Sequence, residues 1–366
     1  RMKKLLVVVG TRPNFIKVAP VIRAIKSAKA QGRNVDYALV YSGAADDPTL
    51  EGTLFDDLQI QKPDMFLGVT CSNLNELTGQ VMAEFERYLQ QHPADVVVVV
   101  DDLASTMAVS IVTKKQGVTL AHIAAGTRSF DITMPKEINR LVIDGLSDIL
   151  FTAGISNNSI ANREGAELSK VYMVGNVLID NLRFDRNRLV RPACMDALGL
   201  DDKGYLVFTL NRKVLIEDKD NLQQMIAAIG RNAHGMKVIA PLRGLAKAVV
   251  EECQKALGSE VLTLVEPLPY LQFGYLTAHA AGVITDSGNV AEEATFNQVP
   301  CITLNSYTEH EETVKVGTSV LVGEDADKLG EQLDKLVTGQ WKRAGLPDRW
   351  DGRSAERIVQ ILLEQR

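Results

Sequence analysis

The chain has 366 residues, of which 46% are hydrophobic and 23% charged, and its formal net charge at pH 7 is -6. This length favours two domains of ordinary size, each with its own core. The acidic balance argues against nucleic acid as the main partner, although a local basic cleft could still bind a phosphate.

Cysteines and apolar runs indicate the compartment. The four cysteines lie far apart without metal-ligand spacing, so we expect buried thiols in a reducing compartment and neither a metal nor another cofactor. The longest strongly apolar run, 94–100, is far too short to cross a bilayer, and the first residues lead into a strand without a signal-peptide layout. We therefore expect a soluble cytoplasmic protein with no membrane insertion.

Short β-branched runs alternate with helical patterns along the chain, as in parallel sheets covered by helices on both faces. The expected strands of the first half are 5–9, 37–41, 96–100, 119–123, 149–152 and 171–174. Those of the second half are 205–209, 237–240, 261–264, 282–285 and 301–304. The predicted fold class is therefore α/β with two Rossmann-like domains, 1–180 and 181–353, joined by a charged crossover at 183–203.

Ligands of open parallel sheets bind outside the carboxyl ends of the strands, and four such places stand out. After the first strand, Arg12 lies beside free helix N–H groups, which indicates an anion site or only a tight turn with a solvated arginine. After the third, Asp101 and Asp102 are adjacent. They are either an acid–base pair with one raised pKa or a cap of the next helix.

The third place is TDSGNVAEEA, where Asp286 or Ser287 caps a helix and Gly288 lets a ligand approach the backbone. Glu292 and Glu293 fall in the opening turns of that helix. The segment is either a phosphate site with a carboxylate on a ribose diol or an ordinary capped helix. The fourth place is EPLPYLQF, where Tyr270 and Phe273 are three apart on a short helix. An aromatic there could stack on a base or belong to the core.

Five segments, GTRPNFIKVAP, HIAAGTRSFDITMPKEINR, VGNVLID, TDSGNVAEEA and VGTSVLVG, together resemble the non-hydrolysing UDP-N-acetylglucosamine 2-epimerases. The resemblance covers nearly the whole chain in the same order. It implies two Rossmann-like domains facing across a cleft, as in GT-B glycosyltransferases, with the C-terminal helix 354–366 on the first domain. It also implies UDP or a UDP-amino sugar as ligand, a homodimer, and a role in nucleotide-sugar metabolism for cell-surface polysaccharide.

The nucleotide half of the family's site is retained. By resemblance, Phe273 would stack on uracil, Glu293 would hold the ribose, and Ser287, Gly288 and Arg12 would contact the diphosphate. The resemblance places four further residues on the sugar side: Arg128, Arg140, Asn211 and Arg212.

The catalytic half is altered. Family enzymes remove the C2 proton and expel UDP to give a glycal, which requires positioned acids and bases. The family's His-hydrophobic-Glu-Ala-Gly reads HIAAG here, with Ala124 in place of the Glu. Its Pro-Glu-Glu reads PKE, with Lys136 in place of the first Glu and Glu137 kept. Thr-Leu-His-Arg reads TLNR, with Asn211 in place of the histidine. Asp102 remains, beside an Asp where the family has Gly.

Three functions stay open. The first is a UDP-sugar enzyme with altered chemistry, by default an epimerase using Asp102, Glu137, His122 or Lys136. The second is a diverged GT-B-type glycosyltransferase that uses a UDP-sugar and needs no C2 base. The third is a catalytically silent UDP-sugar sensor.

Lys136 lies in the first turn of an expected helix, where a cation opposes the helix dipole at about 0.3 to 1 kcal/mol. We expect it to contact an anion, which is the sugar-nucleotide, Asp101 or Asp102. The alternative is a solvated side chain on a long stem.

Overall fold

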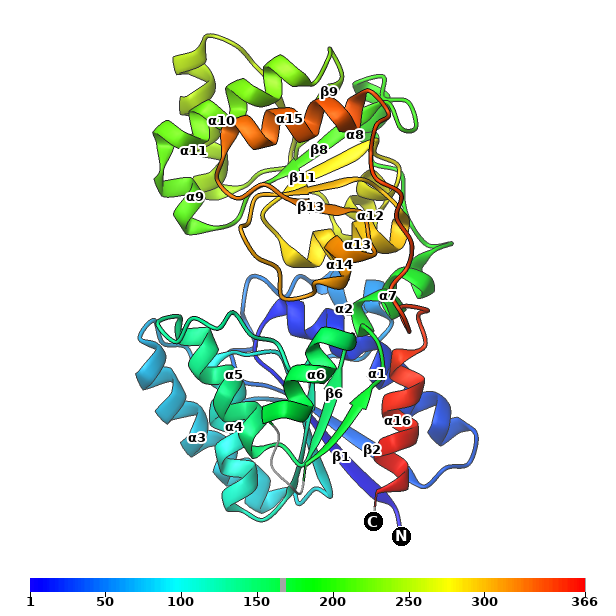
Figure 1. Ribbon diagram of the computed structural model, residues 1–366. Helices are drawn as coiled ribbons and strands as arrows, with labels where there is room; N and C mark the ends of the chain where they lie inside the picture. Colours follow the sequence, from blue (N-terminus) through cyan, green and yellow to red (C-terminus); the bar gives the residue numbers. More distant parts are fainter. Residues whose placement is uncertain (165–168, 366) are drawn as a thin grey trace. The chain divides into compact units, whose positions relative to one another are not determined.

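The computed structural model describes residues 1–164 and 169–365. The chain divides into two compact α/β units (Figure 1). Unit 1 is Arg1–Phe184 with Asp348–Arg366, and unit 2 is Asp185–Pro347. The expected domain limits, 180/181 and 353/354, lie a few residues from these.

Unit 1 contains a seven-stranded parallel sheet in the order β3-β2-β1-β4-β5-β6-β7. Its strands are β1 (Lys3–Val9), β2 (Val35–Tyr41), β3 (Met65–Phe66), β4 (Val96–Val100), β5 (Thr119–Ile123), β6 (Ile149–Thr152) and β7 (Lys170–Met173). Its helices are α1 (Arg12–Ala30), α2 (Gly52–Leu58), α3 (Leu74–Gln91), α4 (Ala104–Lys115), α5 (Pro135–Leu146), α6 (Ile155–Glu164), α7 (Val177–Asp185) and α16 (Ser354–Glu364).

The central strands of unit 1 are apolar because helices cover both faces of the sheet. Every residue of β4 is buried, from Val96 to Val100, and so is most of β1. The bounds of β4, β5 and β6 agree with the expected strands, whereas β3 was not expected. With only two residues, β3 has too little hydrophobic pattern to be recognised without its neighbour β2.

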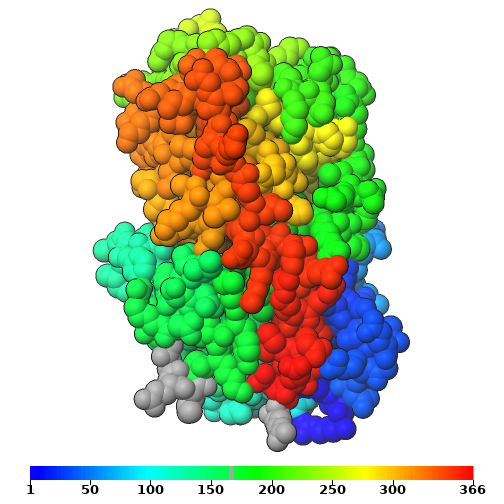
Figure 2. Space-filling view, turned by 45° about the vertical axis from the view of Figure 1, so that its right-hand side comes forward, coloured from blue at the N-terminus to red at the C-terminus, as the bar shows by residue number. Residues whose placement is uncertain are grey.

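The last segment of the chain completes the core of unit 1. Helix α16 packs against α1, and Figure 2 shows its red surface next to the blue N-terminal residues. Asp180 on α7 accepts hydrogen bonds from the backbone N–H groups of Ser354 and Ala355 at 3.1 and 2.8 Å. The fully buried Trp350 donates from Nε1 to the carbonyl oxygen of Ala153 at 3.1 Å.

Unit 2 contains a six-stranded parallel sheet in the order β10-β9-β8-β11-β12-β13. Its strands are β8 (Tyr205–Thr209), β9 (Lys237–Ala240), β10 (Leu262–Leu264), β11 (Gly282–Thr285), β12 (Cys301–Thr303) and β13 (Ser319–Leu321), of which β13 was not expected. Its helices are α8 (Ala193–Ala197), α9 (Lys213–Glu217), α10 (Lys219–Asn232), α11 (Gly244–Leu257), α12 (Tyr270–Ala278), α13 (Gly288–Asn297), α14 (Glu312–Lys315) and α15 (Ala326–Val337).

In each sheet the strand order reverses once, between β1 and β4 in unit 1 and between β8 and β11 in unit 2. Open α/β sheets bind ligands at such switch points, outside the carboxyl ends of the strands. The candidate residues after β1, β4, β8 and β11 therefore lie where each unit's topology favours a ligand. Within the described ranges, no helix combines the length and apolarity needed to cross a membrane.

Candidate functional site

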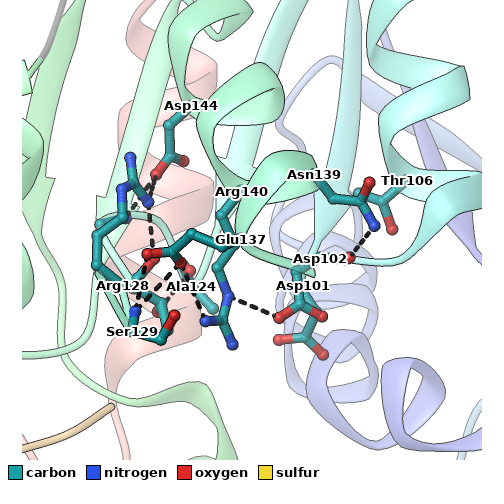
Figure 3. Close-up of polar contacts among 12 residues, drawn as sticks. Asp101, Asp102, Thr106, Ala124, Arg128, Ser129, Glu137, Asn139, Arg140 and Asp144 are labelled. Carbon is teal, nitrogen blue, oxygen red and sulfur yellow. Dashed lines mark hydrogen bonds and ion pairs between the residues drawn. The ribbon is translucent and has the colours of Figure 1, made fainter. Parts of the chain in front are cut away.

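The turn after β4 holds two carboxylates that face different partners. Asp101 accepts hydrogen bonds from Lys17 Nζ at 2.8 Å and Asn14 Nδ2 at 3.0 Å, both on α1. Asp102 accepts one from Arg140 Nε on α5 at 2.9 Å (Figure 3). Each carboxylate thus has its own cation, and the N-cap of α4 is Leu103. The two side chains form neither a shared carboxyl pair nor the helix cap that the sequence suggested.

Glu137 holds the loop that leads into α5. Its carboxylate is 2% exposed and accepts hydrogen bonds from the backbone N–H of Ser129 at 3.0 Å, the N–H of Phe130 at 2.6 Å and Arg140 Nη1 at 3.3 Å. Burial opposes its ionisation, but these hydrogen bonds and the Arg140 charge outweigh burial and lower the pKa of Glu137. A buried, ionised carboxylate with these donors positions the loop and has little capacity left to accept a substrate proton.

His122 on β5 is buried, and both of its ring nitrogens face acceptors. Nδ1 lies 2.6 Å from Asp144 Oδ1, and Nε2 lies 2.7 Å from the carbonyl oxygen of Asp101. A general base needs a free ring nitrogen within reach of its substrate. In this arrangement His122 offers none.

The two predicted sugar-side arginines of unit 1 are buried among carboxylates. Arg128 donates from Nη1 to Asp144 Oδ2 at 2.8 Å and from Nε to Glu164 on α6 at 2.9 Å. Arg140 bridges Asp102 and Glu137 (Figure 3). Both guanidiniums therefore hold the loop and α5 in place.

Lys136 is exposed in the first turn of α5, as the sequence predicts. The expected contact with Asp101 or Asp102 was wrong: among the described residues these carboxylates are held by Lys17 and Arg140 instead. The side chain of Lys136 forms no ion pair within that part of the chain, so a nucleotide-sugar contact stays a prediction.

Arg12 is the first residue of α1 and follows the N-cap Thr11. Its Nε lies 3.3 Å from Glu51 Oε2, and both side chains are partly exposed. The preceding Gly10 allows close packing, because a Cβ there would lie 2.3 Å from Ser105 Oγ. The start of α1 can thus offer the side chain and backbone N–H of Arg12 to an anion, because Pro13 has no N–H and that of Asn14 donates to the carbonyl of Thr11.

At the switch point of unit 2, Asp286 organises the turn after β8. Its buried carboxylate accepts hydrogen bonds from the backbone N–H groups of Asn211 at 2.8 Å and Arg212 at 2.6 Å. Arg212 Nη1 donates to Asn305 Oδ1, and the side chain of Asn211 is exposed. Of the two expected caps of α13, Ser287 is the N-cap and Asp286 is not.

The start of α13 combines an open helix N-terminus with a carboxylate. Gly288 is exposed, and a Cβ added there would meet no atom within 4 Å. Glu292 pairs with His310 Nε2 at 3.0 Å. The half-buried Glu293 makes no hydrogen bond or ion pair with any residue that the structure describes, and burial, with the charges of Glu292 and Asp185, raises its pKa to about 8.

Phe273 lies half-buried on α12, which packs against α13. The aromatic ring and the carboxylate of Glu293 therefore come from neighbouring helices of unit 2. The described residues contain no group of three or more His, Cys, Asp or Glu side chains arranged to hold a metal ion.

Sequence reasoning missed several residues that hold the site. Asp144 shares the buried face of α5 with Glu137 and Arg140, so polar residues at helical spacing were an available signal. Lys17 gave none, because its partner Asp101 lies on another element. Asp286 was expected only as a possible cap of α13, because its actual donors after β8 are distant in the sequence.

Comparisons with known proteins agree along the whole chain. The UDP-N-acetylglucosamine 2-epimerase family model matches residues 27–363. A UDP-N-acetylglucosamine 2-epimerase of Methanocaldococcus jannaschii is 33% identical over 98% of this chain and 98% of its own. A UDP-2,3-diacetamido-2,3-dideoxy-D-glucuronate 2-epimerase of Pseudomonas aeruginosa is 32% identical over 98% of this chain and 99% of its own.

A solved structure gives the same result. The crystal structure of the Methanocaldococcus jannaschii UDP-GlcNAc 2-epimerase in complex with UDP-GlcNAc and UDP matches with a TM-score of 0.84 at 31% identity, covering 99% of this chain and 100% of that one. The match confirms the expected fold class, an α/β chain of two Rossmann-like domains of this GT-B-like type.

Glu137→Gln should destabilise unit 1 by about 1 to 3 kcal/mol, because the buried backbone donors lose an ionised acceptor. Because folding lowers the pKa of Glu137, its contribution to stability is fully present above pH 4.5, the ordinary pKa of a glutamate. The contribution should be lost as the pH falls through the pKa of the folded state. Denaturant unfolding of parent and variant across this range measures it. A difference that stays constant into acid would contradict the assignment.

Proposed function

Because the chain belongs to the UDP-N-acetylglucosamine 2-epimerase family, we propose that it binds UDP and UDP-amino sugars of the UDP-GlcNAc and UDP-ManNAc type. The observation that carries the proposal is Glu293, a half-buried carboxylate without a partner among the described residues. An ionised carboxylate can accept both hydroxyls of a ribose, and binding would supply the donors that the protein itself does not.

The remaining nucleotide contacts follow from each unit's own geometry. In unit 2, Phe273 would stack on uracil, and the N–H groups of Ser287 and Gly288 at the start of α13 would bind phosphate. In unit 1, Arg12 at the start of α1 is the candidate for a phosphate contact. The UDP and UDP-GlcNAc bound by the Methanocaldococcus jannaschii relative support this class of ligand.

We further propose that ordinary C2 epimerisation is slow in this protein. In unit 1, Asp102, Glu137 and His122 each have a partner of opposite charge or a full set of hydrogen bonds. The positions that carry carboxylates in the resemblance hold Ala124 and Lys136 instead. One general acid or base contributes about 10² to 10⁴ in rate, so these losses are large.

The setting we propose is cytoplasmic nucleotide-sugar metabolism that supplies cell-surface polysaccharide. The four cysteines are free thiols, two of them buried, which suits a reducing compartment. The role in supplying cell-surface polysaccharide is inferred only from membership of the family.

A homodimer is the assembly that we propose. Four large apolar side chains of unit 1 are exposed on the loop before α5 and on its first turns: Phe130 (68%), Ile132 (60%), Ile138 (46%) and Leu141 (40%). Exposed apolar residues gathered on one element indicate a protein contact, and a second copy of the chain would cover them.

UDP should stabilise the protein by about 2.7 kcal/mol at about 100 times its Kd. Because only ionised Glu293 accepts both ribose hydroxyls, the affinity for UDP should rise about tenfold between about pH 7 and pH 9, through the pKa of about 8. Glu293→Gln should weaken binding and flatten this dependence, and Phe273→Ala should weaken binding alone.

Isothermal titration calorimetry measures these affinities, with Glu252→Gln, an exposed glutamate elsewhere in unit 2, as the matched control. The proposed nucleotide site is refuted if the folded parent releases or absorbs no heat on titration with UDP, or if Glu293→Gln binds UDP with the same pH dependence as the parent.

Restoring the three replaced groups should restore chemistry. The triple variant Ala124→Glu, Lys136→Glu and Asn211→His should incorporate deuterium at C2 of UDP-GlcNAc at least about 10²-fold faster than the parent. Ala124 already has φ +67°, so a longer side chain adds little to the strain of about 1 to 2 kcal/mol that any L-residue bears there.

NMR in heavy water follows the exchange. Adding Asp102→Asn to the triple variant is the control and should remove the gain. A folded triple variant that binds UDP without faster exchange shows that other residues limit the reaction.

Leu141→Glu should dissociate the proposed dimer, because a carboxylate would be buried in an apolar contact. Val214→Glu in unit 2, which also replaces an exposed apolar side chain, is the control and should leave the assembly unchanged. Sedimentation velocity measures the mass. A parent that sediments as a monomer falsifies the dimer.

A further inference from the structure

We propose that His122 is a permanently protonated imidazolium that positions the turn carrying Asp102, and that it transfers no proton. The residue is 2% exposed and sits near the carboxyl end of β5, next to β4 in the sheet. Its ring joins α5 through Asp144 to the turn after β4 through the carbonyl of Asp101.

The hydrogen-bond geometry determines the charge of the ring. Nε2 faces a carbonyl oxygen at 2.7 Å, which only accepts, so Nε2 must carry a proton. Nδ1 lies 2.6 Å from Asp144 Oδ1. Oδ2 of the same carboxylate already accepts from the N–H of Gly126 at 3.0 Å and from Arg128 at 2.8 Å.

These contacts leave one proton to place, between Asp144 Oδ1 and Nδ1. The Arg128 guanidinium and the Gly126 N–H both stabilise the ionised carboxylate, so the proton belongs on the ring and both nitrogens donate. Burial opposes this charge, but Asp144 and the carbonyl of Asp101 outweigh burial and raise the pKa of His122. The same partners lower the pKa of Asp144 against its own burial.

The charges around the ring balance. Asp144 on α5 faces it directly, Arg128 on the loop between β5 and α5 pairs with Asp144, and Glu164 on α6 pairs with Arg128. On the β4 side, the carboxylate of Asp101 adds a further negative charge and is itself held by Lys17 on α1. His122 and Arg128 together match Asp144 and Glu164, so a cation on the ring completes a neutral cluster, of which only Glu164 is exposed.

The carbonyl that His122 binds belongs to a strained residue. Asp101 has φ +63°, a left-handed conformation that residues with a Cβ rarely adopt. Asn139 Nδ2 holds the next carbonyl, of Asp102, at 3.0 Å, and Arg140 Nε holds the Asp102 carboxylate at 2.9 Å. His122 on β5 and two side chains on α5, Asn139 and Arg140, therefore fix the orientation of Asp102, and Figure 3 shows the two contacts from α5.

This inference uses the proposed function only in taking Asp102 as the carboxylate that faces the sugar. The test of His122 needs no nucleotide. The proposal for His122 can therefore fail while UDP binding is confirmed, and UDP binding can fail while the proposal for His122 is confirmed.

The charge state is read from ring-nitrogen NMR of the full chain labelled with ¹⁵N-histidine, assigned with His122→Gln. At about pH 8, where an ordinary histidine is neutral, both His122 nitrogens should give protonated signals with ring protons protected from exchange. The exposed His234, which also pairs with an aspartate, is the internal control for a solvent-accessible ring. A lone-pair signal from either His122 nitrogen at this pH overturns the proposal.

The positioning role is read from hydrogen exchange of the Arg140 Nε–H that donates to Asp102. His122→Gln should accelerate this exchange at least about tenfold, because the turn loses its cationic donor, and His234→Gln should leave it unchanged. If His122→Gln does not fold, Asp144→Asn removes the counter-charge with little change of shape, and the same acceleration is expected. Unchanged exchange in a folded variant overturns the positioning role.

Discussion

The buried face of α5 is the constraint on which the site of unit 1 depends. Glu137, Arg140 and Asp144 lie on this face at helical spacing, and each is almost inaccessible to water. A buried charge is tolerated only with a partner and full hydrogen bonding. The loop 124–134, the turn after β4 and His122 on β5 supply those partners, so the chain's path around the site is set by the need to satisfy this helix.

Three residues around this buried face have strained backbone conformations. Asp101, Ala124 and Phe130 have φ of +63°, +67° and +61°, and none of them is glycine. Such residues persist only where the surroundings overdetermine them. Here the carbonyl of Asp101 is bound by His122, and the N–H of Phe130 is bound by Glu137. The buried charges of unit 1 thus hold the backbone in conformations that its own sequence disfavours.

The sequence predicted the parts of the fold that local pattern controls. The valines of β4 form a β-branched run with clear ends, so its bounds are recovered fully, whereas β3 and β13 have two and three residues and exist only by pairing with β2 and β12. Ser287 was recognised as a possible cap because N-capping is local. The capping of the β8 turn by Asp286 joins residues 75 positions apart, which no local pattern reveals.

The same limit explains Lys136 and Asp101. The sequence shows that a lysine in the first turn of α5 opposes the helix dipole, so an anionic partner such as Asp101 was expected for it. In the structure, Asp101 pairs with Lys17 instead. The ammonium group of Lys17 is mostly buried and needs a counter-charge, which Asp101 supplies at 2.8 Å. Asp101 adopts the left-handed conformation that glycine tolerates best. The strain at that position is therefore offset by the ion pair, and the carboxylate that the sequence places beside Asp102 holds α1 through Lys17 and Asn14.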